Sequence, residues 1–394
     1  MARVLALGAG AMGAMAARIL SAYDEVDSIV VADLNMRSAE RVALECHGKG
    51  RAVSVDVTRK DDLIGLMKNF DTVMNCVGPF FRFGVPILEA AISAGVNYTD
   101  ICDDPEPTRD MLEMNGQAQA RGITAIVGMG ASPGITNLLG ACAFRSLDGV
   151  DEILTGWNVE EDMSGEASEE IEFSAAIVHW MRQCSGKILE CLDGRLAEGS
   201  PLEDIIIHYP NRGERTIYSV GHPEPVSFRY SYPGLKRSRC AMVMPSKQIG
   251  LFRTLRKQID SKKLTLEQAG RKLVETARES AAPLNQILGF FAALLTDTET
   301  RLPYFFSMVR GSKNNRAATA FASIRSVPAG MDRATGIPLA LGTLMLLQGH
   351  VRHQGVQAPE KAVDPDVFFK LLAPYCTVPE PCPAEELVQL EWAG

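Results

Sequence analysis

The chain has 394 residues, of which 46% are hydrophobic and 22% charged, so it can form two or three packed units and is neither disordered nor fibrous. Its 40 basic and 48 acidic residues give a net charge of −8, which argues against a nucleic-acid partner. The longest apolar runs, residues 287–295 and 339–347, are well short of the roughly 20 residues that span a bilayer, so we expect no membrane anchor.

Cysteine usage and the start of the sequence predict a cytoplasmic protein. The nine cysteines are scattered without a Cys-x-x-Cys pair, as expected of free thiols in a reducing compartment. Residues 1–3 lead directly into a predicted strand, with no apolar signal segment before it. His350 and His353 form a close pair without a cysteine or carboxylate cluster, so we expect no metal site.

The first third of the chain predicts a doubly wound α/β domain. Short β-branched runs alternate with stretches in which apolar residues recur at helical spacing. Thr58 is expected to cap the helix after the third strand, and Pro86 to lie in the first turn of the next helix. The predicted strands are residues 4–7, 29–32, 52–57, 72–77, 97–101 and 124–127.

From about residue 148 the pattern predicts a second domain of the α+β class. Residues 153–159 alternate as a strand does, and an acidic stretch at 160–172 leads into a helix. Asp193-Gly194 and residues 211–213 have the composition of hairpin turns, which indicates antiparallel strands. The remaining predicted elements are helices at 265–280 and 284–295, and strands at 304–310 and 317–326 joined by a turn at 311–315.

A glycine motif predicts a dinucleotide-binding loop between the first strand and the first helix. Gly8 would make the tight turn, Gly10 would let a pyrophosphate approach the backbone, and Gly13 would let helix and strand pack closely. Asp33 ends the second predicted strand, 20 residues after Gly13, where its carboxylate would bind ribose hydroxyls and repel a 2′-phosphate. This favours NAD, although Arg37 leaves NADP possible.

Further residues are expected near the same cofactor. Asp56, at the predicted end of the third strand, could meet the adenine or could simply cap its own turn. The end of the fourth strand should bring Gly78 and Pro79 near the nicotinamide ribose. The predicted cofactor-binding residues are Gly8, Gly10, Ala11, Met12, Gly13, Asp33, Asp56, Val57, Cys76, Val77, Gly78 and Pro79.

Aromatic and acidic residues follow the fourth and fifth strands, at the edge of the sheet where ligands bind. Phe80, Phe81 and Phe83 could wall the nicotinamide pocket or fill the core. Asp100 and Asp103 could move a proton or hold a cationic amine, and such carboxylates suit a helix N-cap cluster equally well. We predict that one of these two aspartates is the catalytic acid or base.

Together these motifs resemble the saccharopine dehydrogenase-like oxidoreductases, and among them the lysine 6-dehydrogenases and carboxynorspermidine dehydrogenases. The resemblance implies a dinucleotide-binding domain completed by the C-terminal segment, and an inserted α+β domain that often mediates dimerisation. It also implies NAD-dependent hydride transfer at a carbon that bears nitrogen, in amino-acid metabolism. The matching stretches are Gly8–Gly13, Asp33, residues 75–79, residues 90–100, Gly130–Gly134, residues 335–338 and residues 355–369.

A lysine-like substrate implied by the resemblance also carries a carboxylate. Arg229 or a helix start at Thr335 are candidate clamps for it, although Arg229 could equally be a surface residue. His179 and Trp180 could face the cleft, but helical spacing favours a core position for Trp180. The predicted substrate-binding residues are Phe80, Phe83, Tyr98, Trp180, Arg229 and Thr335.

We therefore expect a dinucleotide-binding domain at 1–147, an α+β substrate and dimerisation domain at 148–334, and helices at 335–394 that return to the first domain. The expected partners are a small amine or amino-acid substrate and a second copy of the chain, which forms a homodimer. Two alternatives remain: reductive condensation of an amine with an aldehyde or keto acid, and a catalytically silent dinucleotide-binding sensor.

Overall fold

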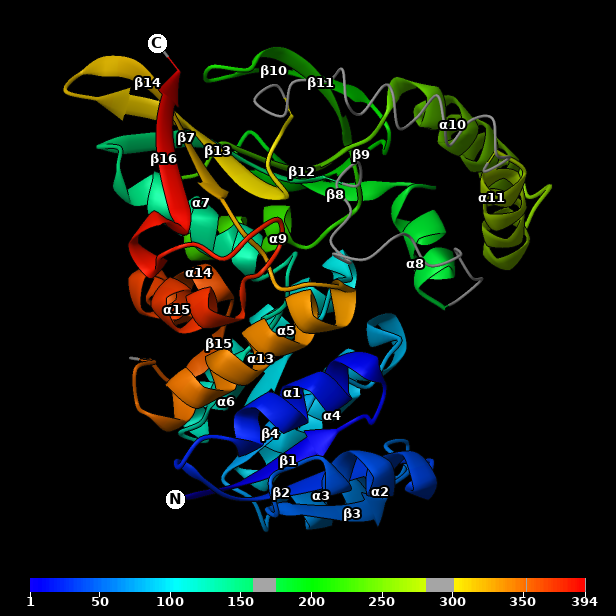
Figure 1. Cartoon of the computed structure of the whole chain (residues 1–394), viewed down its shortest axis with the longest axis vertical. Coiled ribbons are helices and arrows are strands. Elements are labelled where there is room, and N and C mark those ends of the chain that lie inside the picture. The colour runs from blue at the N-terminus through cyan, green and yellow to red at the C-terminus, as the bar shows by residue number, and fades with distance from the viewer. Residues whose placement is uncertain (159–174, 281–300, 352, 394) are drawn as a thin grey trace.

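The computed structural model describes residues 1–158, 175–280, 301–351 and 353–393. Figure 1 shows two sheets at opposite ends of the molecule, with the N-terminus beside the first and the C-terminus beside the second. No helix within these ranges has both the length and the apolar character needed to cross a membrane. The predicted α/β class with a second sheet domain is confirmed.

The first sheet is parallel, and its strands follow the order β15-β6-β5-β4-β1-β2-β3. All six predicted strands are present, and β15 from the C-terminal segment adds a seventh beside β6. The direction of winding reverses between β1 and β4, which is where open sheets of this kind bind ligands. The strands are β1 (Ala2–Leu7), β2 (Val26–Asp33), β3 (Gly50–Ser54), β4 (Thr72–Asn75), β5 (Asn97–Asp100), β6 (Thr124–Ile126) and β15 (Gly355–Gln357).

Three predicted helix starts in this part of the chain are wrong. The helix after β3 begins at Lys60 without a cap from Thr58, whose hydroxyl bonds to Asp56 instead. Pro86 and Pro338 lie inside their helices, because each removes only one backbone donor and the helix continues past it. The helices are α1 (Ala11–Ser21), α2 (Met36–Leu44), α3 (Lys60–Met67), α4 (Phe80–Ala94), α5 (Pro105–Glu113), α6 (Asn115–Ala120), α7 (Ile135–Arg145), α13 (Met331–Leu347), α14 (Pro359–Ala362) and α15 (Pro365–Leu372).

The second sheet is mixed rather than purely antiparallel. Its main path is β10-β11-β12-β7-β13-β14-β16, with β8 and β9 attached to β12. Every pair is antiparallel except β12 with β7. The strands are β7 (Gly149–Asn158), β8 (Ile188–Leu192), β9 (Arg195–Gly199), β10 (Asp204–Tyr209), β11 (Gly213–Ser219), β12 (Arg237–Val243), β13 (Phe305–Lys313), β14 (Arg316–Ile324) and β16 (Val388–Ala393).

The predicted hairpin turns follow from residues that tolerate a positive φ. Asp193 and Gly194 join β8 to β9 at φ of 48° and 73°. The turn between β13 and β14 is shorter than predicted, because Asn314 and Asn315 alone reverse the chain at φ of 51° and 60°. The predicted helix at 284–295 and the acidic stretch at 160–172 lie outside the described residues. The helices of this part are α8 (Ala175–Gln183), α9 (Glu224–Ser231), α10 (Ser246–Asp260) and α11 (Leu266–Ser280).

One continuous apolar core joins the two sheets through α7. The Ser307 hydroxyl of β13 donates to the Thr136 carbonyl of α7, and a side chain on Gly140 would collide with the Phe228 ring of α9. The C-terminal segment serves both sheets, since β15 pairs with β6 whereas β16 pairs with β14. The loop after β6, the start of α7 and the start of α9 are thereby held together.

Candidate active site

The glycine loop has the shape that a pyrophosphate requires. Gly8 has φ of +94°, and a Cβ there would lie 3.0 Å from the Cys76 carbonyl. A Cβ on Gly13 would collide with the Gly8 carbonyl oxygen. Gly10 and Ala11 are exposed at the N-terminus of α1, and nothing lies within 4 Å of the Cβ position of Gly10. Free backbone amides at a helix N-terminus suit a phosphate, so this loop fits a dinucleotide.

Asp33 ends β2 as predicted, and its carboxylate faces the glycine loop. One oxygen accepts a hydrogen bond from the Ala9 amide at 2.8 Å, and the other accepts from the Asn35 amide at 2.8 Å. Both bonds fix the carboxylate where an adenosine ribose would lie in this fold. The NAD preference that we infer from Asp33 stays a prediction.

Asp56 does not end a strand, because β3 stops at Ser54. Its exposed carboxylate accepts hydrogen bonds from the Thr58 hydroxyl at 2.7 Å and the Thr58 amide at 2.9 Å, and these lower the pKa of Asp56. Asp56 therefore caps its own turn, which is the second of the two alternatives given above. Contact of Asp56 or the half-buried Val57 with an adenine stays a prediction.

The loop after β4 lies against the glycine loop. The strand ends at Asn75, two residues earlier than predicted, although the Cys76 amide still donates to the Leu7 carbonyl of β1 at 2.7 Å. Gly78 and Pro79 are exposed, and Cys76 backs Gly8 with its carbonyl. Burial raises the pKa of the Cys76 thiol to about 12, so it stays uncharged. This loop lies where the nicotinamide half of a dinucleotide is expected.

Asp100 and Tyr98 belong to a buried hydrogen-bond network. The Asp100 carboxylate accepts bonds from the Tyr98 hydroxyl (2.8 Å) and from the amides of Cys102 (3.0 Å) and Gly128 (2.7 Å). Asn75 donates to the Tyr98 hydroxyl at 2.9 Å. Both Asp100 and Tyr98 are 0% exposed, and burial raises the pKa of Asp100 to about 6. These two predicted site residues hold the edge of the sheet rather than line an open cleft.

Asp103, Asp104 and His179 form a group that we call the junction cluster. The His179 Nε2 lies 3.1 Å from Asp103 Oδ2, and its Nδ1 lies 3.9 Å from Asp104 Oδ1. Asp103 and Asp104 follow β5, whereas His179 belongs to α8, so the cluster spans the two halves of the molecule. Sequence spacing could not pair residues that lie so far apart along the chain.

The two members of the closest pair favour each other's charged form. Burial by itself would raise the pKa of Asp103, but the hydrogen bond and positive charge of His179 outweigh burial and lower it. Burial would lower the pKa of His179, but Asp103 and then Asp104 outweigh burial and raise it. The pair therefore holds a proton on the imidazole at higher pH than a free histidine would.

An aromatic and an arginine side chain complete this junction. The Arg182 guanidinium lies 4.1 Å above the Phe81 ring, and the Phe81 amide donates to Asp104 Oδ2 at 3.0 Å. Phe81 is 50% exposed, whereas Phe80 is 6% exposed and belongs to the core. Phe83 is half-buried beside Arg82. The core alternative therefore describes Phe80, whereas Phe81 is the most exposed of the three phenylalanines.

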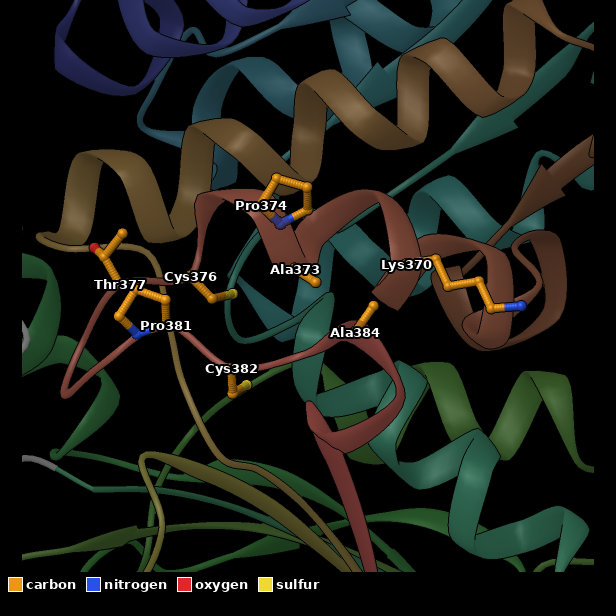
Figure 2. A pocket seen from close by; sticks show the side chains of 8 residues that line it. All are labelled: Lys370, Ala373, Pro374, Cys376, Thr377, Pro381, Cys382 and Ala384. Carbon is orange, nitrogen blue, oxygen red and sulfur yellow. The ribbon is translucent and has the colours of Figure 1, made fainter.

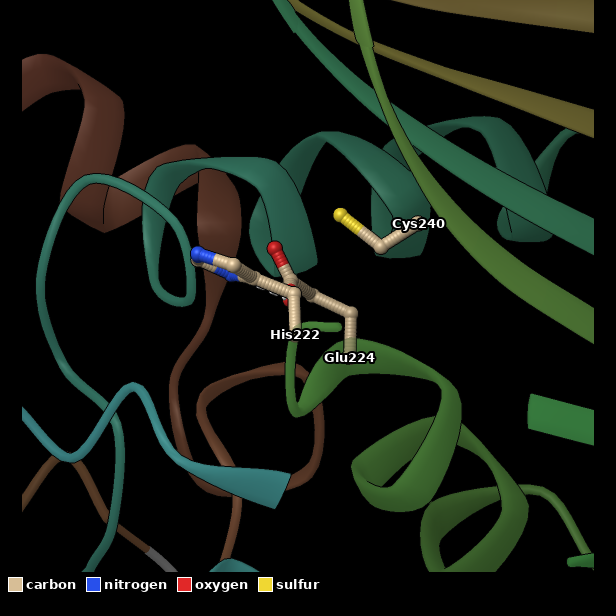
Figure 3. Close-up of side chains that lie close together, drawn as sticks. All are labelled: His222, Glu224 and Cys240. Atoms are coloured by element: carbon tan, nitrogen blue, oxygen red, sulfur yellow. Dashed lines mark hydrogen bonds and ion pairs between the residues drawn. The ribbon is translucent and has the colours of Figure 1, made fainter. Parts of the chain in front are cut away.

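His222, Glu224 and Cys240 form a second group, the buried cluster. Figure 3 shows the three side chains converging from the loop before α9, from α9 and from β12. Nδ1 of His222 lies 3.0 Å from Glu224 Oε2. The other Glu224 oxygen accepts hydrogen bonds from the hydroxyls of Ser132 (2.5 Å) and Thr136 (2.9 Å). Ser132 lies 92 positions from Glu224, so only the fold brings these residues together.

The other predicted substrate residues have structural contacts. The Trp180 ring packs against Trp157 and Phe252, with centroids at 6.3 and 4.8 Å. Arg229 donates to the Gly194 carbonyl in the β8–β9 turn. Thr335 lies inside α13, which starts at Met331, so its predicted place at a helix start is wrong. Its methyl group nevertheless lies beside Gly130, at the edge of the loop that carries Ser132.

A pocket of about 290 Å³ lies elsewhere, next to α15 and the segment that leads to β16 (Figure 2). None of the predicted site residues lines it. Its lining residues are Lys370, Ala373, Pro374, Cys376, Thr377, Pro381, Cys382 and Ala384. The predicted catalytic and cofactor-binding residues therefore lie at the edge of the first sheet and not at this pocket.

Comparisons with known proteins agree with this geometry. Residues 4–126 match the family model described as the saccharopine dehydrogenase NADP binding domain. The chain is 26% identical to carboxyaminopropylagmatine dehydrogenase of Synechocystis sp., with 94% of this chain and 95% of that protein covered. It is 22% identical to carboxynorspermidine synthase of Vibrio alginolyticus, with 94% of each covered. The apo saccharopine dehydrogenase (L-Glu forming) of Saccharomyces cerevisiae shares the fold, with a TM-score of 0.63 and 16% identity over 100% of both chains.

Proposed function

We propose that this chain, an NAD(P)-dependent oxidoreductase whose residues 4–126 form a saccharopine dehydrogenase NADP-binding domain, acts on the carbon–nitrogen bond of a carboxylated amine. The observation that carries the proposal is the Asp103–His179 pair, a proton carrier beside the edge of the sheet where the nicotinamide is expected. The names of the two relatives, a carboxyaminopropylagmatine dehydrogenase and a carboxynorspermidine synthase, support an amine that carries a carboxyl group.

The cofactor and the protein have separate tasks in this reaction. When bound, the nicotinamide supplies or accepts the hydride. The glycine loop and Asp33 would hold the adenosine half, and the loop of residues 76–79 would adjoin the nicotinamide half. We expect the chain to bind NAD more tightly than NADP, because the Asp33 carboxylate would repel a 2′-phosphate. Dissociation constants for NAD and NADP test this choice, and tighter NADP binding by the unmodified chain would overturn it.

His179 would carry the proton of the reaction. In the reductive direction an amine and an aldehyde lose water to form an imine, and the imine takes up a hydride and a proton to become a secondary amine. His179 supplies that proton to nitrogen, and Asp103 keeps the imidazole charged and oriented. In the oxidative direction the pair removes the nitrogen proton before hydride leaves. The second predicted aspartate, Asp100, would act by holding the sheet edge.

Arg182 would bind the carboxylate of the substrate. It lies one helical turn after His179 on α8, so both side chains reach the same junction. Its side chain is 37% exposed and its guanidinium stacks on Phe81, which leaves donors available for a bidentate contact. Arg229 is less suitable because its guanidinium already bonds to a backbone carbonyl.

Turnover of the reduced cofactor tests the proposed reaction. A diamine mixed with an aldehyde that bears an amino-acid carboxylate should consume the reduced cofactor, and mass spectrometry should find the secondary amine. The same aldehyde without its carboxylate is the matched control and should react poorly. If the protein binds the dinucleotide but turns over no pair in either direction, it is a sensor and the proposal is wrong.

We also propose the division into domains at residues 147 and 334, with β16 as a segment that joins the second sheet. Two copies would pair through the exposed edge formed by β16, where Leu390 and Trp392 are partly exposed. All nine cysteines are free thiols, which supports a cytoplasmic location. Light scattering should report a dimer, and a stable monomer would overturn the pairing.

A further inference from the structure

The buried cluster has the composition of a metal site. His222, Glu224 and Cys240 offer an imidazole nitrogen, a carboxylate oxygen and a sulfur, all within 4.8 Å of one another. These are the donor types that Zn²⁺ takes in proteins. None of the three residues is more than 5% exposed. We propose that this cluster binds a divalent zinc-type cation.

The carboxylate donor is already oriented by its neighbours. Ser132 and Thr136 donate to Glu224 Oε1, so Oε2 is the oxygen that faces His222. Carboxylates that bind metals are typically held by such outer hydrogen bonds. The three donors belong to the second half of the molecule, and the two hydroxyls belong to the loop after β6 and to α7. The cation would therefore lie where the two halves meet.

Two buried donors beside the Cys240 sulfur give further support. Thr155 on β7 is the register partner of Cys240 on β12, so both side chains stand on one face of the sheet. Thr155 is fully buried, and its hydroxyl has no hydrogen-bond partner. The indole N–H of Trp157, on the same face of β7, also lacks a partner, and its ring lies 5.8 Å from that of His222. Both donors are directed at the Cys240 sulfur, and a metal-bound thiolate is a stronger acceptor for them than a thiol.

Charge and protons balance in this site. Cys240 loses its thiol proton to solvent when the sulfur binds the cation, and His222 binds as a neutral imidazole. The thiolate and the Glu224 carboxylate then match the two positive charges. Three protein ligands leave a fourth position for water. It would face the Ser132 hydroxyl, which adjoins both His222 and Glu224.

Metal analysis and cobalt spectroscopy of the full chain test the site. Protein purified without an affinity tag or chelator should contain about one zinc ion per chain. Apo protein titrated with Co²⁺ should develop a sulfur-to-cobalt charge-transfer band. Cys240→Ser should lose the band, whereas Cys191→Ser, a matched change at another buried cysteine of the same sheet, should keep it. Ser132→Ala keeps all three ligands and should weaken zinc binding by about tenfold.

A second variant covers the case in which Cys240→Ser fails to fold. His222→Gln keeps the sulfur, and its cobalt complex should bind more weakly and show a changed spectrum. Folded unmodified protein that retains no zinc and gives no charge-transfer band with Co²⁺ would overturn the proposal. A band that survives in Cys240→Ser would overturn it as well.

Discussion

The junction cluster and the buried cluster each pair a histidine with a carboxylate, at 3.1 and 3.0 Å, yet their surroundings differ. In the junction cluster the side chains of His179 and Asp103 are 21% and 38% exposed. In the buried cluster those of His222 and Glu224 are 6% and 0% exposed. A pair that water and substrate can reach is able to exchange a proton with the substrate, whereas a pair buried this deeply is out of the substrate's reach. The two clusters differ in solvent access more than in the distance between histidine and carboxylate, and this difference separates their roles.

The neighbours of each pair strengthen this contrast. Charged and aromatic groups, Asp104, Arg182 and Phe81, surround the junction cluster. The hydroxyls of Ser132 and Thr136 surround the buried carboxylate. Charged neighbours can contact a polar substrate, whereas the hydroxyls hold a buried carboxylate in its charged form. Substitutions in the two clusters should therefore alter different measurements.

The largest effect should come from His179→Gln. We expect kcat to fall on the order of a hundredfold or more, because glutamine cannot carry the proton. In the reductive direction the active form is protonated, so the unmodified rate should be full at low pH and fall as pH rises through the raised pKa of His179. The variant should lack that fall in a pH–rate profile. His208→Gln, at an exposed strand position, is the control.

Asp103→Asn should have a smaller effect of about tenfold on kcat, with a shift of the pH profile. Loss of the negative charge lowers the pKa of His179, so the fall in reductive rate should begin at lower pH. Asp110→Asn, at an exposed aspartate on α5, should leave the profile in place. An unshifted profile in Asp103→Asn would separate Asp103 from the proton carrier.

Arg182→Met should raise KM for the carboxylated substrate by about tenfold and leave kcat nearly unchanged. The methionine retains an apolar stem over Phe81 but has no donor for a carboxylate. Arg229→Met compares the rival clamp, and we expect its KM to stay near the unmodified value. A KM effect in Arg229→Met alone would reverse this assignment.

Thr136→Val should have the smallest effect and should alter stability. The change removes one donor from the buried Glu224 carboxylate, which should reduce the free energy of unfolding by about 1–2 kcal/mol. Chemical denaturation measures this loss, with Thr254→Val on the exposed side of α10 as the control. A changed pH–rate profile in Thr136→Val would show that the two clusters are coupled.

Local features could be predicted from the sequence, whereas long-range contacts could not. The turn of Gly8 and the position of Asp33 were predictable, because each depends on a few neighbouring residues. Pro86 was misplaced because proline disfavours helix interiors only statistically, and one lost hydrogen bond does not stop α4. Asp103 and His179 were each singled out from the sequence, but their pairing could not be predicted, since nothing local joins β5 to α8.

The contacts within the buried cluster could not be predicted from the sequence either. Ser132 lay within one of the stretches that carry the resemblance, but no spacing rule links this loop after β6 to His222 and Glu224, which lie 90 and 92 residues later. Cys240 gave no signal, because a cysteine within an apolar strand is indistinguishable from core. Strand β16 was not predicted either, since its buried and exposed residues alternate too weakly to indicate a strand or its partner.

The use of β15 and β16 in two different sheets has a consequence for biosynthesis. Both sheets depend on strands from the last 40 residues, at the edge of the first sheet and the edge of the second. As the chain emerges from the ribosome, neither half can reach its final form before these residues are made. The two halves should therefore mature together at the end of synthesis, and chaperones should meet a chain whose first sheet keeps an open edge until β15 is made.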